Sequence, residues 1–345
     1  GKRIEDARNG GTSGCVETGA FGKEAYILTG YFNLVKVLEI TLNNGIDPRT
    51  GKKIGLETGD PREFESYDEL MDAYKKQLHH FIEIKIRGNN VIEKLYADLM
   101  PAPFLSILTD DCIKNGKDYN AGGARYNTNY IQGVGIGTLT DSFSAIKKHV
   151  FDDKSFTMSE LLDALKANYE GREAMRQLLM NNTPKYGNDD DYVDSITSDL
   201  SDFYHHEIHQ YTDLFGAPFN SAFMGISNYI PAGSVVGATP EGRKAGTPLT
   251  EGVSPHAGTD VLSPTAALKS AGKINQDIHS GGTLVNIKLS PELLKTDRGL
   301  ANLAAMIRSY FALGAFHVQF NVISPEVLHK AQEKPEEYRD LLVRV

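Results

Sequence analysis

Cys15 and Glu17 lie two positions apart in the glycine-rich stretch GGTSGCVETGAFGKE, which covers residues 10–24. The chain has only two cysteines in 345 residues, so a cysteine in a segment this poor in packing side chains is a candidate for chemistry. Glycines at this density suit a backbone that adopts unusual dihedral angles or approaches a ligand closely. We therefore take Cys15 as a candidate reactive residue, with a small buried hydrophobe as the alternative.

The charge of Glu17 indicates which kind of cysteine chemistry to expect. A thiolate nucleophile needs a base or a positive charge that lowers its pKa, whereas a neighbouring carboxylate disfavours the thiolate. A neutral S–H group can instead give up a hydrogen atom, while a carboxylate two residues away moves a proton on the same substrate. Such one-electron chemistry needs a cofactor or a stored radical to start it. The pair favours this interpretation over a thiolate hydrolase whose base would be a distant histidine.

The other motifs predict structural roles. The acidic stretch GNDDDYVD (187–194) lacks the alternating ligands and the distal glutamate of a calcium loop. The stretch GVGIG (133–137) lacks the spacing of a dinucleotide-binding loop. We expect no metal site, and we expect Arg125 and Arg243 to brace loops and Cys112 to be structural.

The overall composition excludes several classes of protein. A net charge of −9 without a basic stripe argues against a nucleic-acid partner. No run reaches the roughly 18 apolar residues that a membrane span needs. Two cysteines cannot form a disulfide framework. The sequence therefore predicts a cytoplasmic protein that binds neither nucleic acid nor membrane.

The chain has the pattern of one α/β domain over residues 1–345, without a low-complexity linker or a fixed repeat. Apolar spacing predicts a helix over residues 30–45 and a long helix from Ser66 to about Met100, and PAPFLSILTDD (101–111) predicts a buried strand. Toward the end, GTLVNIKLS, FHVQFNVI and LLVRV predict strands that alternate with two helices. Strands alternating with helices imply parallel pairing through right-handed crossovers.

Several segments together resemble one family. The stretch SGCVETGAFGKEAYILTGYFNL closely resembles the active-site loop of the glycyl radical enzymes, the family that includes pyruvate formate-lyase. Similar segments follow in consistent order: GGARYNTNYIQGVG, PKYGNDDDYVD, VGATPEGRKAGTPLTEGVSP and GGTLVNIKLSP. The resemblance implies a ten-stranded α/β barrel made of two five-stranded half-sheets, of which this chain supplies the Cys loop and the second half.

The resemblance also implies a reaction. Cys15 becomes a transient thiyl radical that abstracts hydrogen from the substrate, and Glu17 becomes the general acid/base. The implied activity is that of a lyase that eliminates water from a small hydroxylated substrate such as trans-4-hydroxy-L-proline. A C–S lyase, a C–N lyase and a decarboxylase of the same family remain alternatives.

The substrate pocket is the next implication of the resemblance. Tyr31 matches a pocket tyrosine, and Met224 and Ile226 lie in the segment that corresponds to a pocket strand of the family. That segment departs from the family's pattern, because Gly225-Ile226-Ser227 stands where a similar member carries Pro-Thr-Thr. The departure leaves the identity of the substrate open.

The family stores its radical on a glycine in an Arg-Val-Ala-Gly-Tyr motif, whereas this chain stops at Arg344-Val345. We therefore expect residues 1–345 to be a C-terminal portion of a longer enzyme, with the radical glycine beyond Val345 and no bound cofactor. The resemblance implies a radical S-adenosylmethionine activating enzyme as a partner, and we expect a homodimer. The portion alone should be inactive, and a catalytically silent fragment that acts as a scaffold or binding module is the alternative of another class.

Overall fold

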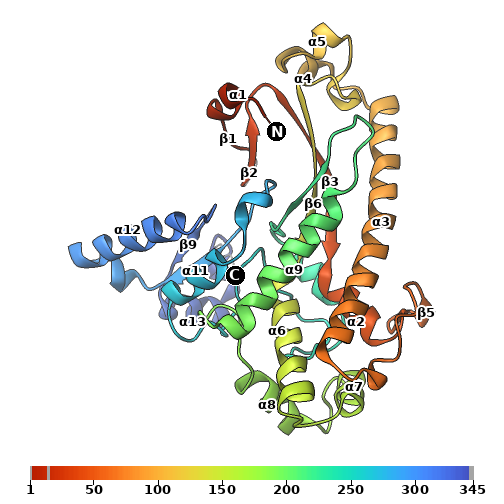
Figure 1. Ribbon diagram of the computed structural model, residues 1–345. Coiled ribbons are helices and arrows are strands. Elements are labelled where there is room, and N and C mark those ends of the chain that lie inside the picture. The colour runs from red at the N-terminus through yellow and green to blue at the C-terminus, as the bar shows by residue number, and fades with distance from the viewer. Residues whose placement is uncertain (1, 14–15, 342–345) are drawn as a thin grey trace.

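The computed structural model describes residues 2–13 and 16–341. Figure 1 shows an elongated body with the long helix α3 (Tyr67–Leu99) along one side. An arm that contains the helices α12 (Asp297–Ala312) and α13 (Pro325–Glu333) extends from the middle of the other side. The hairpin that adjoins Cys15 lies in the upper half of this view, between the arm and the top of the molecule.

A three-stranded parallel sheet runs through the body. Its strands are β3 (Glu24–Asn33), β6 (Tyr126–Val134) and β7 (Phe219–Ala222), with β6 in the middle. Residues 128–134 of β6 are all buried, as expected for a parallel strand that is covered on both faces. A second parallel pair joins β8 (Asn286–Leu289) to β9 (Gln319–Val322). The prediction of parallel pairing is therefore confirmed.

The remaining strands form two antiparallel pairs, and no closed barrel forms within the described residues. The open arrangement agrees with the expectation that this chain supplies only part of a barrel. The pairs are β1 (Gly10–Ser13) with β2 (Glu17–Ala20), and β4 (Ile46–Asp47) with β5 (Lys52–Lys53).

The helices that cover the sheet bury regular apolar stripes. In α9 (Asp191–His209) the buried Val193, Ile196, Leu200, Tyr204 and Ile208 recur every three or four residues, which is the spacing of one helix face. The helix α6 (Ile136–Ile146) packs against α9 and is buried along its whole length. The other helices are α1 (Ile4–Arg8), α2 (Leu34–Leu42), α4 (Pro103–Leu108), α5 (Cys112–Asn115), α7 (Met158–Lys166), α8 (Glu173–Asn181), α10 (Tyr229–Ser234) and α11 (Pro264–Gly272).

Two predicted elements were wrong in whole or in part. The helix expected over residues 30–45 begins only at Leu34, because β3 continues through Asn33, whose side chain caps the helix by accepting a hydrogen bond from the Lys36 amide. The strand expected at 101–111 is the helix α4, with Pro103 in its first turn. A short apolar run cannot distinguish a strand from a helix. The final predicted strand, LLVRV, lies outside the described residues from position 342 on.

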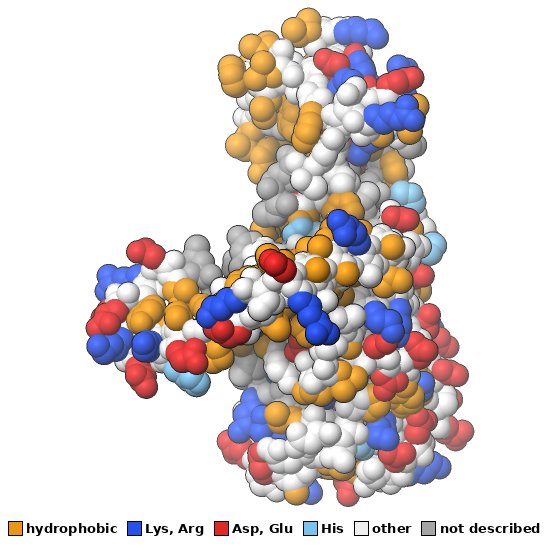
Figure 2. Space-filling view, turned by 90° about the vertical axis from the view of Figure 1, so that its left-hand side faces the viewer, with side chains coloured by type: hydrophobic (Ala, Val, Ile, Leu, Met, Phe, Trp, Pro, Cys, Tyr) orange, Lys and Arg blue, Asp and Glu red, His pale blue; other side chains and the backbone are white. Residues whose placement is uncertain are grey.

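The apolar side chains of α4 point outward instead of into a core. Figure 2 shows them as an apolar area at the upper end of the molecule. Phe104 is 71% exposed and Ile113 is 74% exposed, values far from those of a core residue. We call this area the α4 apolar surface; its members are Met100, Phe104, Leu105, Ile107, Leu108 and Ile113.

The two arginines brace loops, as the sequence predicts. The buried Arg243 guanidinium donates hydrogen bonds to the carbonyl oxygens of Gly233, Gly237, Thr247 and Pro248. Arg125 forms ion pairs with Asp6, Asp110 and Asp111. The buried Cys112 also matches its expected structural role, with an exposed fraction of 0%.

The buried carboxyl group of Asp141 has one oxygen atom without a hydrogen-bond partner among the described residues. That atom is Oδ2, whereas the other carboxyl oxygen of this α6 residue accepts a hydrogen bond from the Tyr186 amide at 2.8 Å. Burial raises the pKa of Asp141 to about 7. The folded state therefore holds a proton that the unfolded chain has already released between about pH 4 and pH 7. Across that range the Asp141 contribution lowers the free energy of unfolding as the pH rises.

We predict that Asp141→Asn removes this pH-dependent loss in the full-length protein. The variant should gain stability relative to the wild type as the pH rises from 4 to 7, by up to about 4 kcal/mol, because the pKa is raised by about three units. Urea unfolding at pH 5 and pH 8 measures the difference. The exposed Asp163→Asn serves as the control. An equal effect of Asp141→Asn at both pH values would contradict the prediction.

Candidate active site

The hairpin formed by β1 and β2 flanks Cys15. Ser13 pairs with Glu17 across the hairpin, and Cys15 itself lies outside the described residues. The Glu17 carboxylate is partly buried, and its Oε2 atom accepts a hydrogen bond from the Val16 amide at 3.1 Å. The structure therefore places one member of the predicted pair and the residue between the two.

The glycines of this stretch serve close packing within the hairpin. A Cβ atom on Gly19 would lie 1.1 Å from the Tyr26 hydroxyl oxygen, and one on Gly10 would lie 2.3 Å from the Gly19 carbonyl oxygen. Real Cβ atoms do not come so close to other heavy atoms. Close contacts within the chain therefore explain why glycine occupies these two positions, without the unusual dihedral angles or the bound ligand that the sequence suggested.

Val16 connects the hairpin to the predicted pocket residues. It is buried in a small apolar cluster with Met224 and Leu284, against which Ile226 and Phe316 pack. The residue between Cys15 and Glu17 therefore shares a cluster with both Met224 and Ile226. Ile226 also has a φ of +48°, in the left-handed region that a β-branched residue rarely adopts. Backbone strain of this kind concentrates at functional sites.

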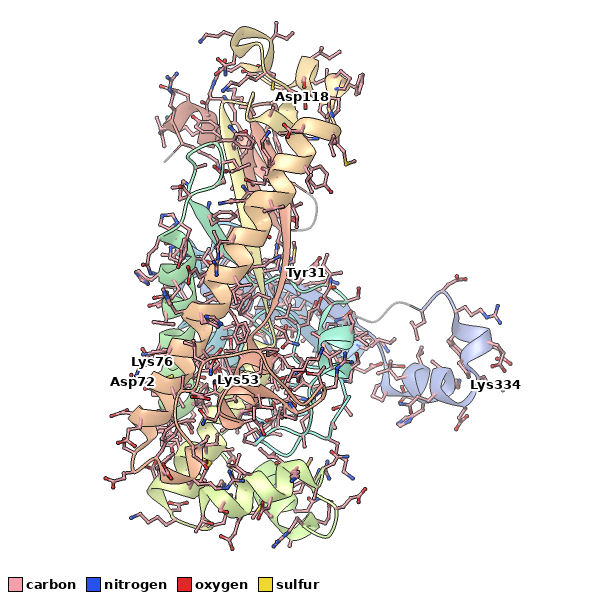
Figure 3. The ribbon with its side chains drawn as sticks, turned by 90° about the vertical axis from the view of Figure 1, so that its right-hand side faces the viewer. Tyr31, Lys53, Asp72, Lys76, Asp118 and Lys334 are labelled. Atoms are coloured by element: carbon pink, nitrogen blue, oxygen red, sulfur yellow. The ribbon has the colours of Figure 1, made fainter. Side chains whose placement is uncertain are left out.

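Tyr31 reaches the same region through the sheet. An irregularity in β3 between Leu28 and Tyr31, with Gly30 at a φ of +96°, sets Tyr31 opposite Gln132 of β6. Residues opposite each other on neighbouring strands share one face of the sheet. The buried Gln132 accepts a hydrogen bond from the Met224 amide at 3.2 Å through its Oε1 atom. Figure 3 labels Tyr31 about halfway along the molecule, where it packs against the main core.

Sequence reasoning missed a turn that also contacts the hairpin. The Thr18 hydroxyl donates a hydrogen bond to the Ser280 carbonyl oxygen at 2.8 Å. A Cβ atom on Gly282 would lie 2.5 Å from the Val16 Cγ2 atom. Gln132 and Gly282 both lie in family-like segments that the sequence analysis quoted, IQGVG and GGTLVN. Their similarity to the family indicated that these segments matter, but it did not show which of their residues contact the hairpin or the Val16 cluster.

A buried histidine pair lies beside this turn and carried no signal in the sequence. The Ser221 hydroxyl bridges the Nδ1 atoms of His205 and His279, at 2.9 Å and 2.7 Å. Burial lowers the pKa of His205 to about 4 and that of His279 to about 3. Both rings are therefore neutral at physiological pH. Because the Ser221 hydroxyl can donate its hydrogen to only one of the two Nδ1 atoms, at least one of the two rings carries its hydrogen on Nδ1 and donates it to the Ser221 oxygen.

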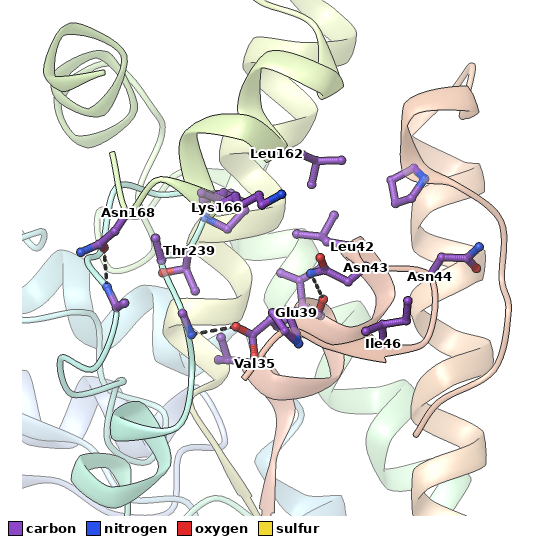
Figure 4. A pocket seen from close by; sticks show the side chains of 18 of the residues that line it. Val35, Glu39, Leu42, Asn43, Asn44, Ile46, Leu162, Lys166, Asn168 and Thr239 are labelled. Atoms are coloured by element: carbon purple, nitrogen blue, oxygen red, sulfur yellow. Dashed lines mark hydrogen bonds between the residues drawn. The ribbon is translucent and has the colours of Figure 1, made fainter. Parts of the chain in front are cut away.

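A separate pocket of about 630 Å³ lies between α2, α7 and the loop at residues 237–245, far from the hairpin (Figure 4). Its polar groups are bonded to neighbouring backbone. Glu39 accepts a hydrogen bond from the Gly237 amide, and Asn168 accepts one from the Ala245 amide, both at 2.8 Å. These side chains tie loops together, so the pocket offers no equivalent of the Cys15–Glu17 pair.

The sequence of the chain matches two family models. The model described as pyruvate formate lyase-like matches residues 1–233, and the model described as glycine radical matches residues 249–345. The chain belongs to the pyruvate formate lyase-like family. Val16 and Met224 come from the part of the chain that matches the first model, and Leu284 and Phe316 from the part that matches the second. The two parts therefore meet at Val16, which follows Cys15 in the sequence.

Relatives within the pyruvate formate lyase-like family cover the whole chain. It is 54% identical to trans-4-hydroxy-L-proline dehydratase of Clostridioides difficile and 37% identical to isethionate sulfite-lyase of Oleidesulfovibrio alaskensis, in each case over 100% of this chain. These matches span 44% and 42% of the two relatives, so the chain covers less than half of their length.

The fold matches solved members of the family equally well. The crystal structure of the Clostridioides difficile hydroxyproline dehydratase with its substrate bound superimposes with a TM-score of 0.96 over 100% of this chain and 44% of that one. The glycerol-bound B12-independent glycerol dehydratase of Clostridium butyricum, 44% identical, superimposes with a TM-score of 0.95 at the same coverage. The expected fold class is therefore confirmed at the level of the family. Separately, the helices of the described residues include none that is both long and apolar enough to cross a bilayer.

Proposed function

We propose that the full-length protein is a glycyl radical dehydratase in which Cys15 and Glu17 act on a small hydroxylated substrate. The observation that carries the proposal is the cluster around Val16. Val16, the residue between Cys15 and Glu17, shares one apolar cluster with Met224 and with Leu284 of the glycine-radical part, and Ile226 and Phe316 pack against that cluster. The residues present thus fit a radical delivered next to the hairpin.

The proposed reaction divides the work between the two side chains. A glycyl radical supplies the unpaired electron, and Cys15 as a thiyl takes a hydrogen atom from the ring carbon beside the nitrogen of trans-4-hydroxy-L-proline. Glu17 gives a proton to the 4-hydroxyl group, which leaves as water. The Cys15 S–H group then returns a hydrogen atom to the carbon that carried the hydroxyl. Loss of the proton on the ring nitrogen leaves 1-pyrroline-5-carboxylate, so the substrate loses one water in total.

Tyr31, Met224 and Ile226 are proposed to line the substrate pocket. The link from Tyr31 through Gln132 to Met224 supports this assignment, because Tyr31 is opposite Gln132 in the sheet and Gln132 bonds to the amide of Met224, a member of the Val16 cluster. The 54% identity to trans-4-hydroxy-L-proline dehydratase favours that substrate. The departure at Gly225-Ile226-Ser227, together with the left-handed Ile226, favours a related C–S lyase, C–N lyase or decarboxylase as the second candidate.

The rest of the proposal concerns the whole enzyme. A radical S-adenosylmethionine activating enzyme would install the radical on a glycine of the full-length protein, and the enzyme would act as a cytoplasmic homodimer. Residues 1–345 would behave as one domain that does not turn over alone. The match of residues 249–345 to the glycine radical model supports the first of these statements.

The test is turnover by the full-length protein, activated without oxygen by its activating enzyme. Trans-4-hydroxy-L-proline, isethionate and glycerol are each supplied, and products are identified by mass spectrometry. We expect 1-pyrroline-5-carboxylate from the first substrate and none from the protein before activation. Turnover of isethionate or glycerol alone would move the assignment to another lyase of the family. A full glycyl radical signal without any product would favour the catalytically silent alternative.

A further inference from the structure

The turn at residues 280–282 contacts the residues on both sides of Glu17. On one side, Thr18 donates its hydroxyl hydrogen to the Ser280 carbonyl oxygen at 2.8 Å. On the other side, Gly282 lies so close to Val16 that a Cβ atom would meet the Val16 carbonyl oxygen at 2.8 Å. Gly282 also has a φ of +100°, which favours glycine. The turn therefore limits the positions that the backbone of Glu17 can take.

The turn is itself fixed to the end of the parallel sheet. The Gly281 amide donates to the Ser221 carbonyl oxygen at 3.2 Å, and the Phe223 amide donates to the Gly282 carbonyl oxygen at 2.8 Å. A Cβ atom on Gly281 would lie 2.5 Å from the Tyr130 ring, so β6 and β7 leave no space for the turn to move inward. The Tyr130 hydroxyl donates to the Thr18 carbonyl oxygen at 3.3 Å, which closes the connection between sheet, turn and hairpin.

The histidine pair holds the start of the turn. His279 immediately precedes Ser280, and its carbonyl oxygen accepts a hydrogen bond from the Gly282 amide at 2.9 Å. Its ring is bound to Ser221 of β7, which His205 of α9 also contacts. Because both rings are neutral and buried, this anchor does not change its charge at physiological pH.

We infer that Thr18 and the turn at residues 280–282 position the Glu17 carboxylate for proton transfer to the leaving group. The inference rests on the proposed function. An acid–base group must lie within hydrogen-bond reach of the atom that it protonates, and small misplacements cost large factors in rate. Thr18 and Gly282 are positioning residues in this assignment, since they act through Glu17 and its neighbours.

The test compares two substitutions of Thr18 in the activated full-length enzyme. Thr18→Val removes the hydroxyl and keeps the shape, whereas Thr18→Ser keeps the hydroxyl. We expect Thr18→Val to lower kcat about fivefold or more, a factor that corresponds to the net contribution of about one hydrogen bond, with KM and the glycyl radical signal unchanged. Thr18→Ser should restore kcat. Thr12→Val is the matched control, because Thr12 is the exposed partner of Thr18 on β1.

A second substitution, Gly282→Ala, tests the contact between the turn and Val16. Gly282→Ala places a Cβ atom against Val16, so we expect a larger loss of kcat than for Thr18→Val. A wild-type kcat for Thr18→Val would overturn the inference. An equal loss of kcat in Thr18→Ser would also overturn it, and so would a loss of kcat that parallels a fall in the melting temperature of the variants. Cys15→Ala separates the two proposals. If it is inactive while Thr18→Val is not impaired, only the positioning role fails; if it turns over normally, the proposed function fails.

Discussion

Cys15→Ala in the activated full-length enzyme will abolish turnover and leave the glycyl radical signal at its wild-type intensity. In the proposed reaction the Cys15 sulfur both takes and returns a hydrogen atom, and no other cysteine of this chain can replace it, because Cys112 is buried with an exposed fraction of 0%. Removing the residue that forms and breaks the reacting bonds costs on the order of 10⁴-fold or more in kcat. Product formation and electron paramagnetic resonance on the same sample measure the two quantities.

Cys112→Ala is the matched control for this experiment. Cys112 packs with Ala25 and Ala124 in a small cluster of its own. Its replacement should leave kcat unchanged and lower stability only slightly, since a thiol is small. The prediction fails if Cys15→Ser, which keeps a similar shape, turns over at the wild-type rate.

Glu17→Gln will slow elimination by about 10²- to 10⁴-fold, the usual contribution of a positioned acid or base. Glutamine has the shape of glutamate and its side-chain oxygen can still accept the hydrogen bond from the Val16 amide, so the hairpin should keep its geometry. Hydrogen abstraction does not need the carboxyl proton. We therefore expect a substrate labelled with deuterium beside the ring nitrogen to lose its label to solvent while little product forms.

Loss of label distinguishes a missing acid from a collapsed site. The exposed Glu5→Gln on α1 is the control, and it should match the wild type in both product and label. A kcat within twofold of the wild type for Glu17→Gln would remove Glu17 from the reaction. Loss of both label exchange and product would indicate that the site, and not the acid alone, had been damaged.

The candidate site could be proposed from the sequence because its two central residues are only two positions apart along the chain. Cys15 and Glu17 need no tertiary contact to be brought together, and the sign of the carboxylate charge already limits the chemistry. The contacts around Glu17 and the Val16 cluster come from far along the chain. Thr18 and Ser280 are 262 positions apart, and Gln132 and Met224 are 92 positions apart. Which residues meet across those distances depends on how the hairpin, the sheet and the turn at residues 280–282 pack together, and local patterns do not state that packing.

The difference between local patterns and contacts made by distant residues also explains the errors in the predicted secondary structure. The long helix from Ser66 to about Met100 was predicted well, because α3 repeats its apolar stripe over many turns. The short apolar run at 101–111 had no such repeat. Its helix is stabilised by Asp118, whose carboxylate accepts hydrogen bonds from the Ala102 amide and the Ser106 hydroxyl. A capping group that lies 16 positions away from the backbone it caps is not visible in local apolar spacing.

The α4 apolar surface bears on how the isolated chain behaves in solution. Large side chains such as Phe104 and Ile113, gathered at one end of the molecule, attract one another between molecules as they would inside a core. Concentrated solutions of residues 1–345 would therefore self-associate through this end.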